Sequence, residues 1–221
     1  MPPATISYCV PGTTWNYHTP NDGSEIGGNE PTGYKLVKLP NGAVYLEITG
    51  TNYSDVEFYA TLPVIPEVFT GNLVHEFDIT CDPANSSVVQ AREFDSILTY
   101  QGYTYENQGS IQLNVNEGGK IQITASNGQW VDIGDNPGIF IPGSATHIRL
   151  TMKFDLVKHT GGVVGVSING SLDFPIPSIF QNEASQAKKW DDCLFAQFQL
   201  DTTKIGGTFG EQISNGTYTY F

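Results

Sequence analysis

The sequence predicts an all-β protein, an antiparallel β-sandwich or jelly roll of about ten to twelve strands with at most one short helix. From residue 43 onward, short runs with strand-like alternation recur about every ten residues. Clusters of Gly, Asn, Asp and Pro separate these runs and supply turn chemistry. Because helical segments do not alternate with the strands, a parallel α/β sheet is excluded.

Residues 1–42 differ from the rest of the chain. They are rich in Pro, Gly, Asn and Thr, and clusters of turn-forming residues occupy 19–23 and 27–31. They contain too few apolar residues for a core of their own. We therefore expect an irregular N-terminal arm or long loop, with at most one short strand, packed on a sandwich domain that spans 43–221.

The remaining elements are expected in a regular order. Asn116–Gly119 is predicted to join two strands as a hairpin turn, and Asn169–Gly170 a second pair. Only Asn182–Lys189 has the pattern of a helix, about two turns long. The strands are expected at Ala43–Thr49, Val56–Leu62, Leu73–Cys81, Arg92–Tyr100, Ser110–Val115, Lys120–Thr124, Trp130–Ile133, Thr146–Asp155, Val163–Ile168, Ser171–Phe174, Leu194–Asp201 and Thr217–Phe221.

The alternation is clearest in Thr146–Asp155. Apolar side chains occupy the even positions, and polar or charged side chains, including His147, Arg149 and Lys153, occupy most of the odd ones. This period of two predicts a strand with one buried and one hydrated face.

Thr146–Asp155, a turn that contains glycine, and Val163–Leu172 together resemble a hairpin of the concanavalin A-like (laminin G-like) lectin/glucanase superfamily. In that superfamily a strand of the type H-x-I/L-x-L leads to V-x-V-x-I-D/N-G-x-L. The resemblance covers residues 146–172. It implies two curved antiparallel sheets, with a concave face or rim loops for glycans, as in lectins, carbohydrate-binding modules, glucanases, polysaccharide lyases and viral attachment domains.

The chain is strongly acidic. Ten Lys and Arg stand against 23 Asp and Glu, which gives a formal net charge of −13. This charge disfavours nucleic acid and anionic membranes as partners, and no apolar run is long enough to cross a membrane. A carbohydrate or a protein surface is the expected partner, and a homo-oligomer is left open. The first residues do not have the pattern of a signal peptide, and extracellular or virion-surface display is expected from the polarity and turn density.

Three cysteines occur at positions 9, 81 and 193. Their spacing matches no zinc pattern. Buried free thiols and a single disulfide are both compatible with the sequence.

Two pairs of carboxylates have the same spacing within a strand. Glu93 and Asp95 share one strand face, and so do Glu76 and Asp78. Paired carboxylates are what glycoside hydrolysis requires. Sandwich glucanases carry E-x-D-x-x-E on one strand, but here Leu98 replaces the last acid. If the protein is an enzyme, Glu93 and Asp95 are the predicted catalytic residues; a solvated polar face is the alternative.

The sequence is compatible with two other kinds of site. His147, Arg149 and Lys153, together with Tyr100, Tyr103 and Tyr105, would offer the cations and bases of a polysaccharide lyase; a cross-strand polar ladder is the alternative. No cofactor is expected, apart from calcium, which oxygen-rich loops would allow. The candidate loops are 21–25 and the segment that holds Asp132, Asp135 and Asn136.

The aromatic residues outnumber what a core needs. Exposed aromatic rings stack on sugar rings, while neighbouring amides bond the hydroxyl groups, and residues 100–108 have this composition; core packing is the alternative. The predicted glycan-binding residues are Tyr100, Tyr103, Tyr105, Asn107, Gln112 and Trp130.

These observations favour a non-catalytic, lectin-like module that binds glycans or another surface. A polysaccharide hydrolase or lyase of the same fold is one alternative. A structural capsid or decoration subunit is the other, with the first 42 residues serving as an assembly arm.

Overall fold

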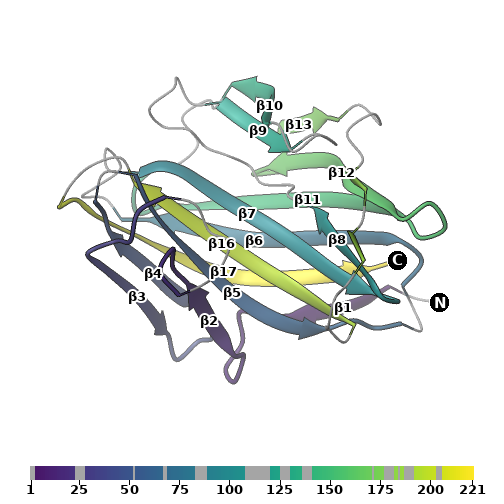
Figure 1. Cartoon of the computed structure of the whole chain (residues 1–221), viewed down its shortest axis with the longest axis horizontal. Helices are drawn as coiled ribbons and strands as arrows, with labels where there is room; N and C mark the ends of the chain where they lie inside the picture. The colour runs from purple at the N-terminus through teal and green to yellow at the C-terminus, as the bar shows by residue number, and fades with distance from the viewer. Residues whose placement is uncertain are drawn as a thin grey trace.

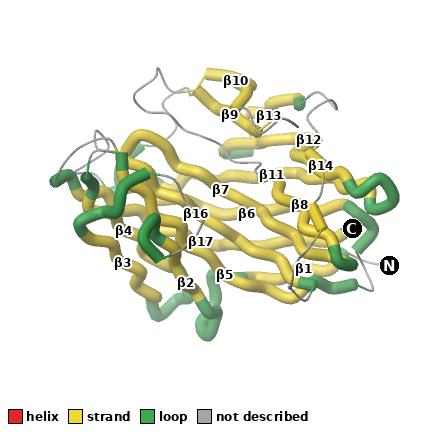
Figure 2. Tube along the Cα trace, in the orientation of Figure 1, coloured by secondary structure: helices red, strands yellow, loops and turns green. Residues whose placement is uncertain are grey.

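A computed structural model describes most of the chain, and every regular element in the described part is a β-strand (Figure 2). The prediction of an all-β sandwich is therefore confirmed. The described residues are 3–22, 28–51, 53–66, 69–82, 89–107, 120–124, 130–135, 141–170, 172–176, 182–183, 185–186, 192–202 and 206–221.

The larger sheet has nine strands and contains both ends of the chain. Its order is β13 (Leu172–Pro175), β12 (Thr160–Ile168), β11 (Ala145–Asp155), β6 (Asn72–Cys81), β17 (Thr208–Tyr220), β4 (Val44–Thr49) and β3 (Gly33–Lys38). In addition, β1 (Ala4–Ser7) pairs with β17, and β14 (Asn182–Glu183) pairs with β12.

The smaller sheet has six strands and lies face to face with the larger one (Figure 1). Its order is β15 (Ser185–Gln186), β8 (Tyr103–Asn107), β7 (Val89–Tyr100), β16 (Cys193–Thr202), β5 (Ser54–Pro63) and β2 (Trp15–His18). A separate two-stranded ribbon consists of β9 (Lys120–Thr124) and β10 (Trp130–Asp135).

The hydrophobic core fills the layer between the two sheets. In β5 and β16, every second side chain is apolar and buried, so these side chains point toward the larger sheet and the intervening ones point away from it. The larger sheet contributes β11 in the same way, with Ile148, Leu150, Met152 and Phe154 buried. The alternation predicted for 146–155 is confirmed. The expected hairpin of β11 with β12 is present. Asn169 and Gly170, in the predicted turn from β12 to β13, adopt positive φ angles.

Three short regions differ from the sequence-based expectation. The first 42 residues contain three strands rather than at most one. Each of them pairs with a strand of the sandwich: β1 with β17, β2 with β5 and β3 with β4. The expected helix over 182–189 is wrong where it is described, since β14 and β15 are extended and pair with β12 and β8. The partner expected for β9, Ser110–Val115, lies outside the described residues, and β9 pairs with β10.

A buried polar network crosses the core. The Tyr8 hydroxyl lies 2.6 Å from His75 Nε2, and His75 Nδ1 lies 3.0 Å from Ser96 Oγ. The Tyr218 hydroxyl donates to the same Ser96 oxygen at 2.9 Å. Burial lowers the pKa of His75 well below its usual value, so the ring is neutral and offers one donor and one acceptor. This Ser–His pair is fully enclosed and links the two sheets.

A buried ion pair forms a second link between the sheets. Arg92 on β7 donates from Nε to Glu211 Oε2 on β17 at 2.8 Å, and both side chains are at most 2% exposed. The Arg92 guanidinium also lies over the Phe209 ring, 4.6 Å from its centroid. Burial raises the pKa of Glu211, and Arg92 partly offsets this effect.

Replacing Arg92 with Met is expected to lower the free energy of unfolding by about 3–5 kcal/mol, because Glu211 would lose its buried counter-charge. The double variant Arg92→Met/Glu211→Leu should recover most of this loss. Urea denaturation monitored by tryptophan fluorescence measures both. Equal losses in the single and double variants would contradict this account of the pair.

Candidate functional site

The outward side of the six-stranded sheet gathers five carboxylates. The buried apolar residues of β5, β7 and β16 point toward the core, so the residues between them face away from it. We call this side the acidic face and define it by ten of its outward polar and aromatic residues on β2, β5, β7 and β16. These are His18, Asp55, Glu57, Tyr59, Glu93, Asp95, Phe195, Gln197, Gln199 and Asp201.

The strand register places these side chains in rows across the sheet. Tyr59, Gln197 and Asp95 are direct cross-strand partners, and Gln197 Nε2 donates to Asp95 Oδ2 at 3.1 Å. The next row contains Glu57, Gln199 and Glu93, and the row after it pairs Asp55 with Asp201. Partners in such rows lie about 4.5–5.5 Å apart between Cα atoms, so neighbouring rows form one continuous polar layer. Four of its members are buried at 4–9% exposure: Asp55, Asp95, Gln197 and Asp201.

Aromatic rings line the edge of the acidic face. The His18 ring on β2 stacks on the Tyr59 ring, with centroids 4.8 Å apart and an interplanar angle of 16°. Asp22 Oδ2 lies 3.0 Å from His18 Nδ1 and fixes the orientation of the imidazole. Phe195 on β16 packs edge-on against Tyr59 at 6.0 Å. These partly exposed rings stand beside the amides and carboxylates of the rows.

Three carboxyl groups of this face have raised pKa values. Burial raises the pKa of Asp55 to about 6, and a hydrogen bond from Asp201 offsets part of that rise. Burial, followed by repulsion from Glu93 and Asp55, raises the pKa of Asp201 well above its usual value. Burial also raises the pKa of Glu57 to about 7. Asp55 and Asp201 therefore share one proton, which is bound to Asp201 and hydrogen-bonded to Asp55.

The predicted pair Glu93 and Asp95 lies on the acidic face, beside three carboxylates that the sequence analysis did not select. The pair itself followed from the period of two within one strand. Asp55, Glu57 and Asp201 have the same period in β5 and β16, and that pattern was the available signal. The sequence did not show that β5, β7 and β16 are neighbours, so the shared face could not be found.

The predicted aromatic glycan site is divided by the fold. Tyr100 and Tyr105 belong to the core at 6% and 3% exposure, so they have no ring face to offer a sugar, and the expectation that they are exposed is wrong. They are buried because their side of β7 and β8 faces the larger sheet. Tyr103 is partly buried and stacks on His159 at 3.5 Å between ring centroids.

The other predicted glycan-binding positions lie apart from these tyrosines. Trp130 begins β10, on the separate ribbon. Asn107 ends β8, and Gln112 lies outside the described residues. Their role in binding stays a prediction.

Two of the predicted calcium ligands already have partners on the ribbon, and calcium binding there stays a prediction. Asp135 is paired with Lys120, and Asp132 accepts a hydrogen bond from Gln122 at 2.6 Å. Asn136 lies outside the described part of the chain. No three described His, Cys, Asp or Glu side chains are arranged to hold a metal ion.

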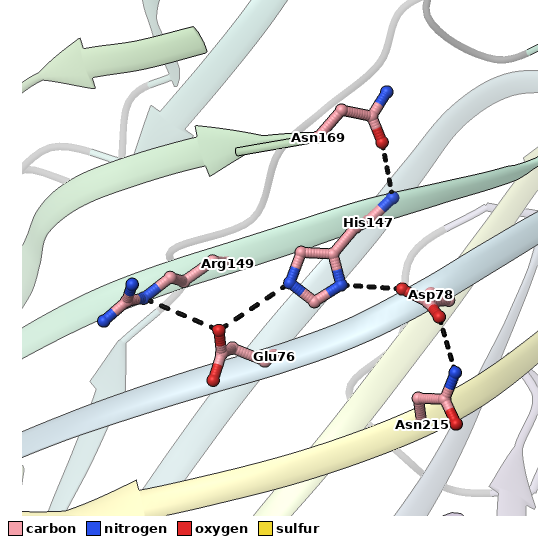
Figure 3. Close-up of polar contacts among 6 residues, drawn as sticks. All are labelled: Glu76, Asp78, His147, Arg149, Asn169 and Asn215. Carbon is pink, nitrogen blue, oxygen red and sulfur yellow. Dashed lines mark hydrogen bonds and ion pairs between the residues drawn. The ribbon is translucent and has the colours of Figure 1, made fainter. Parts of the chain in front are cut away.

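The remaining carboxylate pair forms a polar ladder on the outward side of the larger sheet (Figure 3). His147 Nδ1 lies 2.7 Å from Asp78 Oδ1, and Glu76 Oε1 lies 3.7 Å from both His147 Nε2 and Arg149 Nε. Asn215 donates from Nδ2 to Asp78 Oδ2 at 2.6 Å. Each acid here faces a base across the strands. The proposed lyase set is not assembled, because Tyr100 and Tyr105 are buried in the core while His147 and Arg149 point away from it.

The three cysteines are buried free thiols. Burial raises the pKa of Cys9 to about 11 and that of Cys81 to about 12, so neither is a thiolate near neutral pH. Within the described residues, no helix is present that could cross a membrane.

Comparison with solved structures identifies the fold. The chain is similar to peanut lectin in complex with a 9mer peptide (TM-score 0.51, 8% identity, covering 99% of this chain and 98% of that one). It is similar to lectin UEA-II complexed with galactose (TM-score 0.50, 8% identity, covering 99% and 97%). It is also similar to alginate lyase vAL-1 from a Chlorella virus (TM-score 0.51, 10% identity, covering 94% and 93%).

The chain thus has the concanavalin A-like lectin/glucanase sandwich fold, as the resemblance of residues 146–172 implied. No protein-family model and no curated protein matches its sequence. At these identities the likeness concerns the fold alone.

The raised pKa values predict that the protein is less stable at higher pH. The folded state binds more protons than the unfolded chain between the usual carboxyl pKa of about 4 and the folded values of about 6 for Asp55 and about 7 for Glu57. The melting temperature should therefore fall as the pH rises from about 4 to about 8. The share of Asp55 is on the order of 3 kcal/mol.

Two variants separate this effect from general charge repulsion. Asp55→Asn should flatten the pH dependence, because it removes one of the raised groups. Asp135→Asn removes the same charge from a side chain that is 80% exposed and should leave the slope unchanged. Equal slopes in all three proteins would refute the assignment.

Proposed function

We propose that the protein is a non-catalytic, lectin-like module that binds carbohydrate on the acidic face. The row of Tyr59, Gln197 and Asp95 carries this proposal, since it places an aromatic ring, an amide and a carboxylate side by side on adjacent strands. A ring of this kind stacks on the apolar face of a sugar, and the amide and carboxylate bond its hydroxyl groups. The galactose complex of lectin UEA-II, which has the same fold, supports the ligand class.

The proposal needs no metal ion, because the face itself supplies the polar groups. Extracellular or virion-surface display belongs to the same proposal and is supported by the acidity of the chain, with its net charge of −13.

Affinity electrophoresis through gels that contain neutral or acidic polysaccharides tests binding. We expect at least one polysaccharide to retard the protein while staying intact, with and without EDTA. Tyr59→Ala should reduce the retardation about tenfold, because the stacking ring is lost. Lys153→Ala, on the outward side of the larger sheet, is the matched control and should bind as the original protein does.

Other outcomes of this experiment would direct the assignment elsewhere. Loss of binding in Tyr103→Ala but not in Tyr59→Ala would place the site near β8. Loss with EDTA would show that calcium is required. No retardation by any polysaccharide would reject carbohydrate binding and favour the structural alternative.

A second candidate function is glycoside hydrolysis, and the pKa of Glu57 favours it. Glu57 and Glu93 flank Gln199 in one row, two strand spacings or about 9.5 Å apart at the backbone. This is close to the carboxyl separation of about 6.5–9.5 Å in inverting glycosidases. With its pKa raised to about 7, Glu57 would be the acid and Glu93 the base.

Release of reducing ends from neutral polysaccharides tests the enzymatic candidate. Turnover that falls by at least about 100-fold in Glu57→Gln, with melting temperature maintained, would support it. Binding without any release of reducing ends would reject it.

A further inference from the structure

The two sheets end close together at one edge of the sandwich, where β3 is the last strand of the larger sheet and β2 the last strand of the smaller one (Figure 1). Tyr34 on β3 is the cross-strand partner of Ile48, which is completely buried. Tyr17 on β2 is the partner of Phe58, which is also completely buried. Because cross-strand partners project to the same side of a sheet, both tyrosines project toward the layer between the sheets.

The rings of Tyr17 and Tyr34 are in direct contact at this edge. Their centroids lie 4.6 Å apart, and their planes are inclined by 52°. The two side chains are hydrogen-bonded, and this bond, followed by burial and nearby negative charge, raises the pKa of Tyr34 to about 12. Tyr17 is 45% exposed. The pair therefore combines a ring-to-ring contact with access from solvent.

Other tyrosines lack this combination. Within the described residues, Tyr8 and Tyr218 form the one further contact between two tyrosine rings, with centroids 5.8 Å apart, and both side chains are fully buried. Tyr53 is 53% exposed but has no ring contact in the described part of the chain. An oxidant in solution could therefore reach Tyr53 or Tyr17, but only Tyr17 has a second phenol beside it.

We propose that Tyr17 and Tyr34 are a site of oxidative cross-linking, where a one-electron oxidant, such as a haem peroxidase with hydrogen peroxide, joins the two rings as dityrosine. Each phenol loses one electron and its hydroxyl proton and becomes a phenoxyl radical, whose unpaired electron lies partly on the ring carbons next to the C–O carbon. A bond forms between one such carbon of each ring. The hydrogen on each bonded carbon moves to the oxygen and restores the phenol. The protein loses two hydrogen atoms, and one hydrogen peroxide is reduced to two waters.

The cross-link would fasten two edge strands to each other. Strands at the end of a sheet have a neighbour on one side only and open more easily than central strands. A covalent bond between β2 and β3 would also remove conformations from the unfolded chain, as a disulfide does. The three cysteines, whose thiolates would quench a phenoxyl radical, are buried.

Treatment of the dilute chain with a haem peroxidase and hydrogen peroxide at near-neutral pH tests the proposal. Free tyrosine in a parallel reaction shows that the reagent forms dityrosine. We expect a monomer that has lost two hydrogen atoms and shows the blue fluorescence of dityrosine. Its yield should not change on about tenfold dilution, because the coupling is intramolecular. Digestion after glutamate cuts between the two tyrosines, at Glu25 and Glu30, so mass spectrometry should find their two peptides joined.

Variants locate the cross-link. Tyr17→Phe and Tyr34→Phe should each lower the dityrosine in the monomer by at least about tenfold, because phenylalanine has no hydroxyl group to oxidise. Each variant keeps the ring and therefore the packing at this edge. Tyr53→Phe removes a more exposed hydroxyl group outside the pair and should leave the yield unchanged. The cross-linked monomer should melt about 5 °C higher than the untreated chain, and peroxidase-treated Tyr17→Phe should not.

Four results would overturn the proposal. Dityrosine found only in covalent dimers, or equal monomer yields in the three variants, would contradict the assignment to this pair. No dityrosine in the protein while free tyrosine is converted would contradict it as well. A cross-link between Tyr17 and Tyr34 that leaves the melting temperature unchanged would contradict its role in fastening the edge. Carbohydrate binding is tested separately, because neither tyrosine belongs to the acidic face.

Discussion

Each long strand buries the side chains of one face between the two sheets. This constraint limits which residues the opposite face of the strand can carry. In β5 and β16 the inward positions are mostly apolar, and the outward positions are where polar groups can be placed without loss of core. The acidic face is thus a product of the same alternation that forms the core. A shift of one residue in register would turn its carboxylates toward the opposite sheet and its apolar side chains away from it.

The core also contains polar groups that are bonded between the two sheets. Arg92 and Glu211 pair at one position, and His75 lies between Tyr8 and Ser96 at another. A sandwich held only by apolar contacts could tolerate sliding of its sheets. Polar partners that must meet across the layer restrict the relative position of the sheets, because a displaced group would be buried without a hydrogen bond.

The outward faces of the two sheets carry similar residues in different electrostatic environments. On the larger sheet, Glu76 and Asp78 are compensated by Arg149 and His147, and the result is a half-exposed ladder of small energetic weight (Figure 3). On the smaller sheet, Asp55 and Asp201 face each other, and their burial stores unfavourable electrostatic energy. Strongly raised pKa values of this kind cluster at functional sites, although structural networks produce them too.

The sequence by itself determined the local features of this protein. The period of two identified β11 and its hairpin with β12, the turn residues marked most strand ends, and the alternation placed Glu93 and Asp95 on one face. These features depend on neighbours along the chain. Tyr100 and Tyr105 are buried, against expectation, because composition cannot tell the two sides of a strand apart when both carry aromatic or polar residues.

Only the tertiary structure decided which strands lie side by side. Strands β5, β7 and β16 begin at residues 54, 89 and 193, yet they are adjacent in one sheet, and their pairing brings Asp55, Glu93 and Asp201 together. The same pairing gave Glu76 a basic neighbour and Asp55 an acidic one. Strand order depends on how the whole set of strands closes a core, since hydrogen bonds between strands are formed by backbone groups that are alike at nearly every residue. The carboxylates could therefore be found from the sequence, but the site they form could not.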